Sequence, residues 1–254
     1  MHICRTRVHT WGRTNRVSFD PGKEHVVILH PISGEGDPFK LLGCMTDCKL
    51  LMTQAVDKIL SQLRPKRYAI LRTKSHYDVR SLINQFKTHV WGIMETHNGA
   101  IFHAADYLLE KLNSAQRHFL YELDVTPEQA FLDHNFAPPN LRRDIGIPGL
   151  LHKRVLGISH PIFFELLPFH VDVFGSLRTG EHNKQLYGHI LEVQFQHALH
   201  FRSIFAMVYV YNRLPQEVVD CTSVSLFQRG LTLQARKLCR DGDPNWTCSF
   251  SCRV

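Results

Sequence analysis

The sequence predicts an α+β protein that is mainly α-helical, with one short β-hairpin near its N-terminus. After residue 48, apolar residues recur every three or four positions over long stretches, the spacing of helices with one buried face. Before residue 48, the apolar residues instead form two short runs on either side of a glycine-rich loop. We therefore divide the chain into residues 1–48 with the hairpin, a helical segment 49–125 and a second helical segment 126–254.

The predicted hairpin joins an apolar run at residues 26–29 to a second run at residues 39–43. The loop between them, residues 33–38, contains two glycines, and glycine adopts the positive φ angles that tight loops need. Loops of this size are common between antiparallel strands. We expect the two runs to pair with each other.

Segment 49–125 carries three apolar stripes at helical spacing, which predicts a small helical bundle. The first helix is expected to stop at Pro65, because proline lacks the amide hydrogen that continues a helix. The second helix is expected to end at Asn98-Gly99. The stripes are Met52, Ala55, Val56, Ile59, Leu60 and Leu63; Val79, Leu82, Ile83, Phe86, Val90 and Ile93; and Leu108, Leu112, Ala115, Phe119 and Leu123.

Segment 126–254 opens on a strong helix start, because Thr126 and Gln129 match a capping box with Pro127 at the first helical position. The prolines of residues 137–140 precede a further helix, which Pro148 is expected to kink or split. The remaining predicted elements are a charged, loop-like linker over residues 168–184 and helices around residues 200–213 and 223–239, the second starting at Thr222.

Composition excludes several classes of protein. Charged residues make up 21% and apolar residues 44% of the 254 residues, a balance that excludes a disordered or collagen-like chain. No run approaches the length of a membrane-spanning helix, so no membrane association is expected. The start of the chain lacks the apolar core of a secretory signal, and seven cysteines are an odd number, so an intracellular protein with reduced thiols is favoured.

The positive charge of the chain is concentrated in one window. Thirty Lys and Arg against 23 Asp and Glu give a net charge of +7, and residues 58–80 hold seven basic residues with Asp78 as the single acid. Tyr68, His76 and Tyr77 lie among them, which suits contacts with phosphates and stacking on bases. The alternative is a solvated basic turn that serves solubility alone. The seven residues are Lys58, Arg64, Lys66, Arg67, Arg72, Lys74 and Arg80.

Searches for catalytic and metal-binding motifs give no match. The chain has no phosphate-binding glycine loop, no nucleophile elbow, no H-E-x-x-H pattern and no adjacent pair of Asp residues. The 17 histidines are scattered, so no metal site is predicted. A His- or Cys-dependent metalloprotein stays open as a third alternative, with Cys44, Cys48, Cys248 and Cys252 as the candidate zinc ligands.

Several motifs in order resemble the C-terminal part of a non-LTR retrotransposon reverse transcriptase. The stretch at residues 11–19, followed by Lys23, is similar to the fourth palm motif, and residues 39–43 resemble the hairpin called the primer grip, with Leu42 and Gly43 at its centre. Segment 49–125 would be the thumb. The motifs that resemble the region after the thumb are Arg142-Arg143-Asp144-Ile145 and Tyr211-Asn212-Arg213-Leu214-Pro215, with Phe227 after them.

The resemblance implies a palm remnant, a helical thumb and a helical C-terminal extension that bind RNA or an RNA–DNA hybrid in the nucleus. In this family the carboxylates that hold two Mg²⁺ ions lie in motifs before the equivalent of residue 1. Lys23 would match the family's palm lysine, but no catalytic residue and no cofactor are expected in this chain, and Mg²⁺ only in a full-length enzyme. The missing upstream part of the polymerase is the second expected partner. The alternative function is a non-catalytic helical interaction module without nucleic-acid binding.

Overall fold

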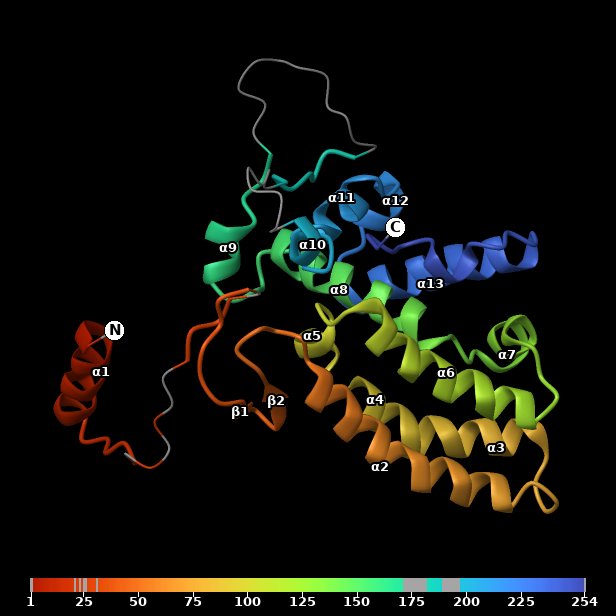
Figure 1. Ribbon diagram of the computed structural model, residues 1–254. Coiled ribbons are helices and arrows are strands. Elements are labelled where there is room, and N and C mark those ends of the chain that lie inside the picture. Colours follow the sequence, from red (N-terminus) through yellow and green to blue (C-terminus); the bar gives the residue numbers. More distant parts are fainter. Residues whose placement is uncertain are drawn as a thin grey trace. The chain divides into compact units, whose positions relative to one another are not determined.

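The computed structural model describes residues 2–20, 22, 24, 27–30, 32–170, 182–188 and 197–253 (Figure 1). The chain divides into two compact units, Met1–Leu50 and Leu51–Val254, and each is described by itself. The predicted fold class is confirmed, because the structure is mainly helical with one short antiparallel hairpin near the N-terminus. Within the described ranges, no helix combines the length and the apolar character needed to cross a membrane.

The first unit contains helix α1 (His2–Thr14) and a hairpin of strands β1 (Phe39–Leu41) and β2 (Cys44–Thr46). The sequence pattern did not predict α1, which buries little apolar surface. Phe19 folds back onto this helix at Gly12, where an added Cβ would lie 2.4 Å from the phenyl ring. Gly12 is therefore the position that allows the chain after α1 to pack against it.

The hairpin pairs different residues from those predicted. Strand β1 pairs with β2 directly after it, through a two-residue turn at Leu42 and Gly43, whose φ angles are 47° and 87°. Two positive φ angles match the right-handed twist of paired strands, and glycine tolerates the second without strain. The predicted pairing of residues 26–29 with residues 39–43 is wrong for the described residues 27–29, because β1 pairs with β2 across the closer turn, and Val26 lies outside the described residues. Ile28 instead forms an isolated antiparallel bridge with Glu35.

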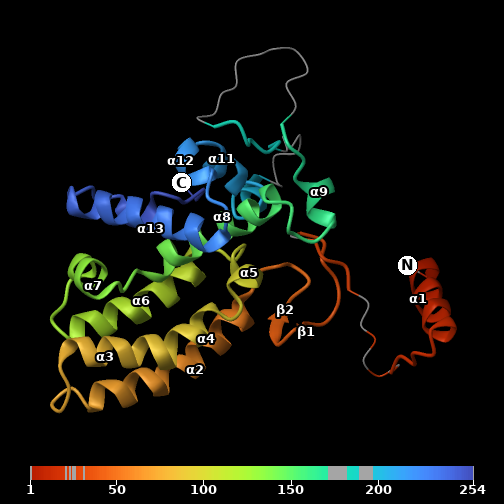
Figure 2. The ribbon, with the colours of Figure 1, turned by 180° about the vertical axis from the view of Figure 1, so that it is seen from behind.

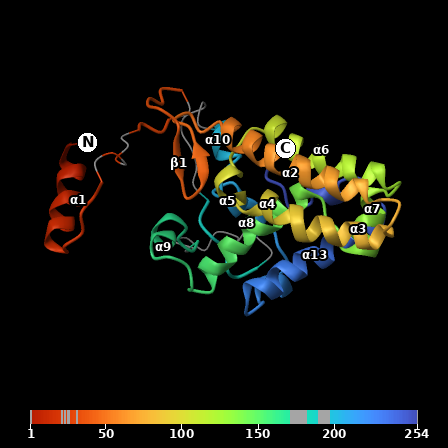
Figure 3. The same ribbon diagram turned by 90° about the horizontal axis from the view of Figure 1, so that it is seen from below.

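The second unit begins with a bundle in which the predicted apolar stripes are buried, except for Val79 and Ile93, which are half-buried. Helices α2 and α6 pack along each other, and α3 continues through one π-helical turn into α4 (Figure 3). The elements are α2 (Thr53–Arg72), α3 (Val79–Phe86), the π-helix η2 (Lys87–Trp91), α4 (Gly92–Glu95), α5 (Asn98–Ile101) and α6 (Asp106–Glu122).

Helix α2 does not stop at Pro65 but continues to Arg72. Pro65 is exposed, so the carbonyl that loses its helical partner faces solvent and can bond to water. Beyond the proline, Arg67 and Ile70 extend the buried stripe. The prediction was wrong because burial of this second half of α2 outweighs the local cost of proline.

The rest of the second unit surrounds α8, which Figures 1 and 2 both place between α6 and α13. One apolar core joins α7, α8, α11, α13 and η4. The elements are α7 (Pro127–His134), α8 (Pro139–Val155), α9 (Ile162–Leu166), α10 (His197–His200), α11 (Met207–Asn212), α12 (Gln216–Val219), α13 (Val224–Arg240) and the 3₁₀ helix η4 (Trp246–Cys248).

The predicted helix starts are largely confirmed. The capping box before α7 is present, since Thr126 accepts a bond from the Gln129 amide at 3.2 Å and Gln129 accepts one from the Thr126 amide at 3.1 Å. Helix α13 is capped by Ser223 rather than starting at Thr222. The helix predicted around residues 200–213 is shorter, because α11 begins at Met207. Of the predicted linker, residues 171–181 lie outside the described residues.

Helix α8 runs as one element from Pro139 to Val155 through Pro148, so the predicted split does not occur. Pro148 itself is buried, and Ile147 and Leu151 beside it belong to the core. A proline inside a helix costs about 3 kcal/mol or more. Because α8 packs on several neighbours at once, the burial of its side chains offsets that cost.

Candidate nucleic-acid interface

Six of the seven predicted basic residues are exposed on α2, on α3 or in the turn between them. We call these six the α2–α3 basic surface: Lys58, Arg64, Lys66, Arg72, Lys74 and Arg80. The seventh, Arg67, is only 8% exposed. Its Nη1 donates to the carbonyl of Ala115 on α6 at 3.3 Å, so this guanidinium ties two helices together inside the bundle. Arg67 is therefore not available to an external phosphate.

The four residues of this surface that lie on α2 point in different directions around the helix axis. Lys58 and Arg72 are fourteen residues apart, which places them on one face of α2 and roughly 21 Å apart along its axis. Arg64 and Lys66 are two residues apart, or about 200° around the helix, so they lie on opposite flanks. On α2, the basic surface is thus one exposed face that carries Lys58 and Arg72, with Arg64 on one flank and Lys66 on the other.

The turn between α2 and α3 gathers the other cations at one end of the bundle. Lys74 Nζ donates to the carbonyl of Glu122 at the end of α6, which fixes the turn against that helix. Asp78 caps α3 by accepting the Ser81 amide at 3.0 Å, and hydrogen bonding from the side chain and the amide of Ser81 holds the pKa of Asp78 below its ordinary value. The single acid of the window is therefore an ionised helix cap, and Arg80 follows it in the first turn of α3.

A groove of about 330 Å³ runs between α2 and the helix formed by η2 and α4. The side chains of Thr88 and Thr96 donate to carbonyls of their own helix, so the remaining donors are one lysine, one glutamine and two histidines. None of its described lining residues carries a carboxylate. Such a groove suits an anionic oxygen. The lining residues are Gln62, Lys66, Thr88, His89, Gly92, Ile93, Thr96 and His97.

His89 lies in η2 and His97 in the turn between α4 and α5, so neither shares a helix with Lys66. Their spacing of eight residues would leave them about 80° apart even on one continuous helix, so periodicity in the sequence does not connect them. The structure brings the two histidines to the groove beside Lys66.

The pairing of charges distinguishes this surface from its surroundings. Among the described residues, no carboxylate lies within 4.0 Å of any member of the α2–α3 basic surface. By contrast, Lys111 pairs with Asp57, and Arg117 pairs with Glu110 on the neighbouring α6. The basic side chains of α2 and α3 are thus left with water or an external anion as their charge partner.

The Arg142-Arg143-Asp144 motif has a structural role. Arg142 makes two bonds to Glu95, one of them at 2.7 Å, and its guanidinium lies 3.6 Å above the Trp91 ring. Arg143 donates to Asn113 on α6 at 2.8 Å. Burial raises the pKa of Asp144 to about 7. The motif joins α8 to the first bundle, so helices before and after residue 125 pack within one unit.

The motif that begins at Tyr211 is also structural at its first two positions. Tyr211 is fully buried and its hydroxyl lies 3.0 Å from His152 Nδ1 on α8. Asn212 pairs with the backbone of Leu186, accepting from its amide at 3.0 Å and donating to its carbonyl at 2.8 Å. These bonds hold residues 182–188 against α11. Arg213, the third residue of the motif, is exposed, whereas Tyr211 is buried and Asn212 is half-buried.

The remaining predicted site residues are Lys23, the Leu42–Gly43 turn and the four candidate zinc ligands. Lys23 lies outside the described residues. Leu42 and Gly43 form the hairpin turn, with Leu42 93% exposed. Cys44 and Cys48 belong to the first unit and the other two candidate zinc ligands to the second. Among the described residues, no group of three or more His, Cys, Asp or Glu side chains is arranged to hold a metal ion.

Comparison with known proteins finds no match to a protein-family model, to a curated protein or to a solved structure.

Proposed function

We propose that this chain binds the sugar–phosphate backbone of RNA or an RNA–DNA hybrid through the α2–α3 basic surface. The observation that carries the proposal is the presence of six exposed cations with no carboxylate among the described residues within ion-pair distance. A duplex or strand would supply the missing charge partners. Because phosphates are common to every sequence, this binding positions a nucleic acid without selecting a base sequence.

The dimensions of the surface are compatible with several phosphates. Lys58 and Arg72 span roughly 21 Å of α2, and a strand advances about 3.4 Å per phosphate, so this face covers about six phosphates. Tyr68 and Tyr77 are each 51% exposed beside the cations. Tyrosine rings at such positions stack on bases or sugars at the end of a backbone contact.

The resemblance to the C-terminal part of a non-LTR retrotransposon reverse transcriptase supports the choice of RNA or a hybrid as ligand. On that proposal the first bundle is the thumb, and the exposed turn at Leu42 and Gly43 is the tip of a primer-grip-like hairpin. The chain then binds a template–primer in the nucleus, with the upstream part of the polymerase as a second partner. Without the metal-binding carboxylates of the family, the purified chain is not expected to extend a primer.

The experiment is a salt titration of binding to a fluorescent RNA–DNA hybrid, measured by anisotropy. The variant replaces Lys66, Arg72 and Arg80 with Gln. Each lost phosphate contact lowers the slope of log K against log salt by about 0.9, so the full variant should lose between about 2 and 3. The hybrid sequence should not matter.

The matched control replaces Arg229, Lys237 and Arg240 on α13 with Gln. These three side chains are also exposed, and the change in net charge is equal. An equal loss of slope in both variants would mean that overall charge, not the α2–α3 basic surface, binds the hybrid. Absence of hybrid binding by the folded wild-type chain would favour the non-catalytic interaction module instead.

A further inference from the structure

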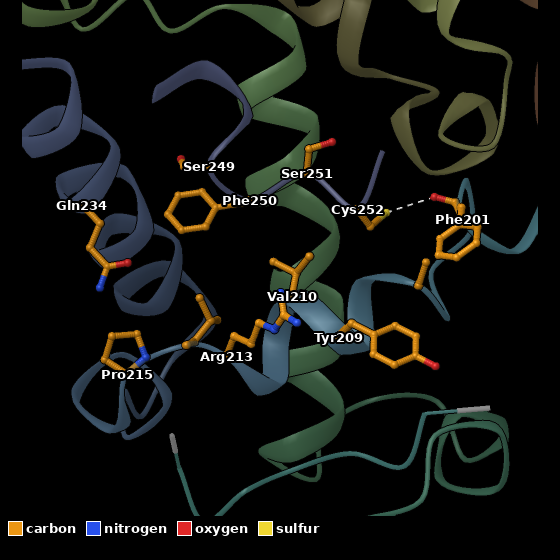
Figure 4. Close-up of a pocket in the computed structure, with 12 residues that line it drawn as sticks. Phe201, Tyr209, Val210, Arg213, Pro215, Gln234, Ser249, Phe250, Ser251 and Cys252 are labelled. Carbon is orange, nitrogen blue, oxygen red and sulfur yellow. Dashed lines mark hydrogen bonds between the residues drawn. The ribbon is translucent and has the colours of Figure 1, made fainter. Parts of the chain in front are cut away.

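A second concave site lies between α11, α13 and the C-terminal segment, and Figure 4 shows its lining. Its volume is about 360 Å³, within the range of pockets that hold small organic ligands. No residue of the α2–α3 basic surface contributes to it. The lining residues are Phe201, Ala206, Tyr209, Val210, Arg213, Leu214, Pro215, Gln234, Ser249, Phe250, Ser251 and Cys252.

Arg213 is the charged residue of this lining. Within the described part of the chain, no carboxylate lies within 4.0 Å of it. Burial raises the pKa of the Cys252 thiol to about 11, and the thiol donates to the Phe201 carbonyl at 3.2 Å, so Cys252 is neutral. Among the described lining residues, the pocket therefore presents one positive charge and no negative charge, which suits a ligand with one anionic group.

The wall beside Arg213 is aromatic and only partly covered by the protein. Phe201 is 50% exposed and Tyr209 is 46% exposed, whereas Tyr211 on the same helix is fully buried. In Figure 4 both rings lie on the side of the pocket away from Gln234. Two half-exposed rings at one edge of a pocket form a stacking platform for a planar group.

The opposite wall supplies neutral hydrogen-bonding groups. Gln234 offers both an amide donor and a carbonyl acceptor. The Ser249 hydroxyl donates to the Trp246 carbonyl at 3.1 Å, which leaves its oxygen free to accept. A planar ring with a donor–acceptor edge and a single attached phosphate would satisfy the aromatic wall, the polar wall and Arg213 together.

We infer that this pocket, the α11–α13 pocket, binds one nucleoside monophosphate unit, with the base against Phe201 and Tyr209 and the phosphate on Arg213. Two kinds of ligand carry this unit: a free mononucleotide and the 5′-phosphorylated end of a strand. The inference is independent of the proposed hybrid binding, since different side chains carry it.

Isothermal titration with AMP, adenosine, inorganic phosphate and 5′-phosphorylated tetra-adenylate tests the site. AMP should bind with a saturable isotherm, and adenosine and inorganic phosphate should each bind at least about tenfold more weakly, because each lacks one half of the ligand. Stronger binding of the tetranucleotide than of AMP identifies the strand end, and the reverse identifies the free nucleotide. Saturable binding of neither would overturn the inference.

Arg213→Gln should weaken AMP binding about tenfold or more, because it removes a charge-assisted contact from an exposed position where folding is not at stake. The matched control is Arg229→Gln, an exposed arginine of α13 that does not line the pocket. Tyr209→Leu should also weaken AMP binding. Equal AMP affinity in wild type and Arg213→Gln, or equal binding of adenosine and AMP, would refute the assignment.

Discussion

The hydrogen-bonded pair of Tyr211 and His152 gives a prediction of stability that can be worked from the structure. His152 Nε2 lies 2.8 Å from the carbonyl of Cys221, which can only accept, so Nε2 carries the proton. In the neutral ring Nδ1 is then an acceptor, and the Tyr211 hydroxyl donates to it at 3.0 Å. Both side chains are fully buried. Burial also lowers the pKa of His152, in agreement with a neutral ring.

Tyr211→Phe removes the hydroxyl but keeps the ring, whose centroid lies 5.8 Å from that of Phe227. The variant leaves His152 Nδ1 buried without a donor, which costs about 1–3 kcal/mol. For a unit of roughly 200 residues, each kcal/mol lowers Tm by about 2–4 °C, so the melting temperature should fall by about 2–12 °C. Circular dichroism during thermal and urea unfolding at pH 8 measures both quantities.

The matched control is Tyr209→Phe, on the same helix but half-exposed, which should change stability by less than about 0.5 kcal/mol. In a His152→Phe background, Tyr211→Phe should cost clearly less, because its partner is already absent. If Tyr211→Phe and Tyr209→Phe melt together, or if the His152→Phe background leaves the cost unchanged, the assigned hydrogen bond does not stabilise the protein.

Three further variants test other parts of the second unit. Burial raises the pKa of Asp144 from 3.8 to about 7, so between about pH 4 and pH 7 the native state holds a proton that the unfolded state has lost. The wild-type protein should therefore become less stable as the pH rises through this range. Asp144→Asn cannot titrate, so its stability should not fall in this way. Parallel Tm–pH curves for the variant and the wild type would contradict this. Arg142→Lys should cost about 1.5–3 kcal/mol in urea unfolding, because lysine cannot keep both bonds to Glu95; an unchanged midpoint would argue against the pair. Leu63→Ala should cost about 2–5 kcal/mol in the same assay, since Leu63 is fully buried in α2, and a cost below 1 kcal/mol would show that the bundle is loosely packed.

The helices that bury one continuous stripe were predictable from the sequence. The stripe of α6 and the capping box before α7 depend on residues within one or two turns of each other, so local pattern is sufficient. Helix α1 has no such stripe and was not predicted. Helix α9 and helix α12 are too short for periodicity to show.

The two wrong predictions made from prolines have one physical cause: proline acts locally, whereas contacts with residues distant in sequence decide whether the helix continues. Pro65 and Pro148 both predict helix ends by their own chemistry, yet both helices continue because the residues beyond each proline are buried against other helices. The hairpin error is the reverse case. A nearer turn at Leu42 and Gly43 outcompeted the glycine-rich loop, and the positive φ that Gly43 accepts was the signal in its favour.

The candidate interface shows how far a count of charges can be taken from sequence alone. The window contains seven cations, but Arg67 follows Leu63 by four residues and Ile70 follows three residues later, so Arg67 occupies the apolar stripe. Helical phase therefore already separates a structural arginine from the four exposed cations of α2, Lys58, Arg64, Lys66 and Arg72. Phase does not reveal whether a carboxylate from another helix neutralises an exposed cation, as Asp57 does for Lys111. The absence of acidic partners among the described residues depends on how the helices pack, and it makes the basic window a candidate phosphate-binding surface.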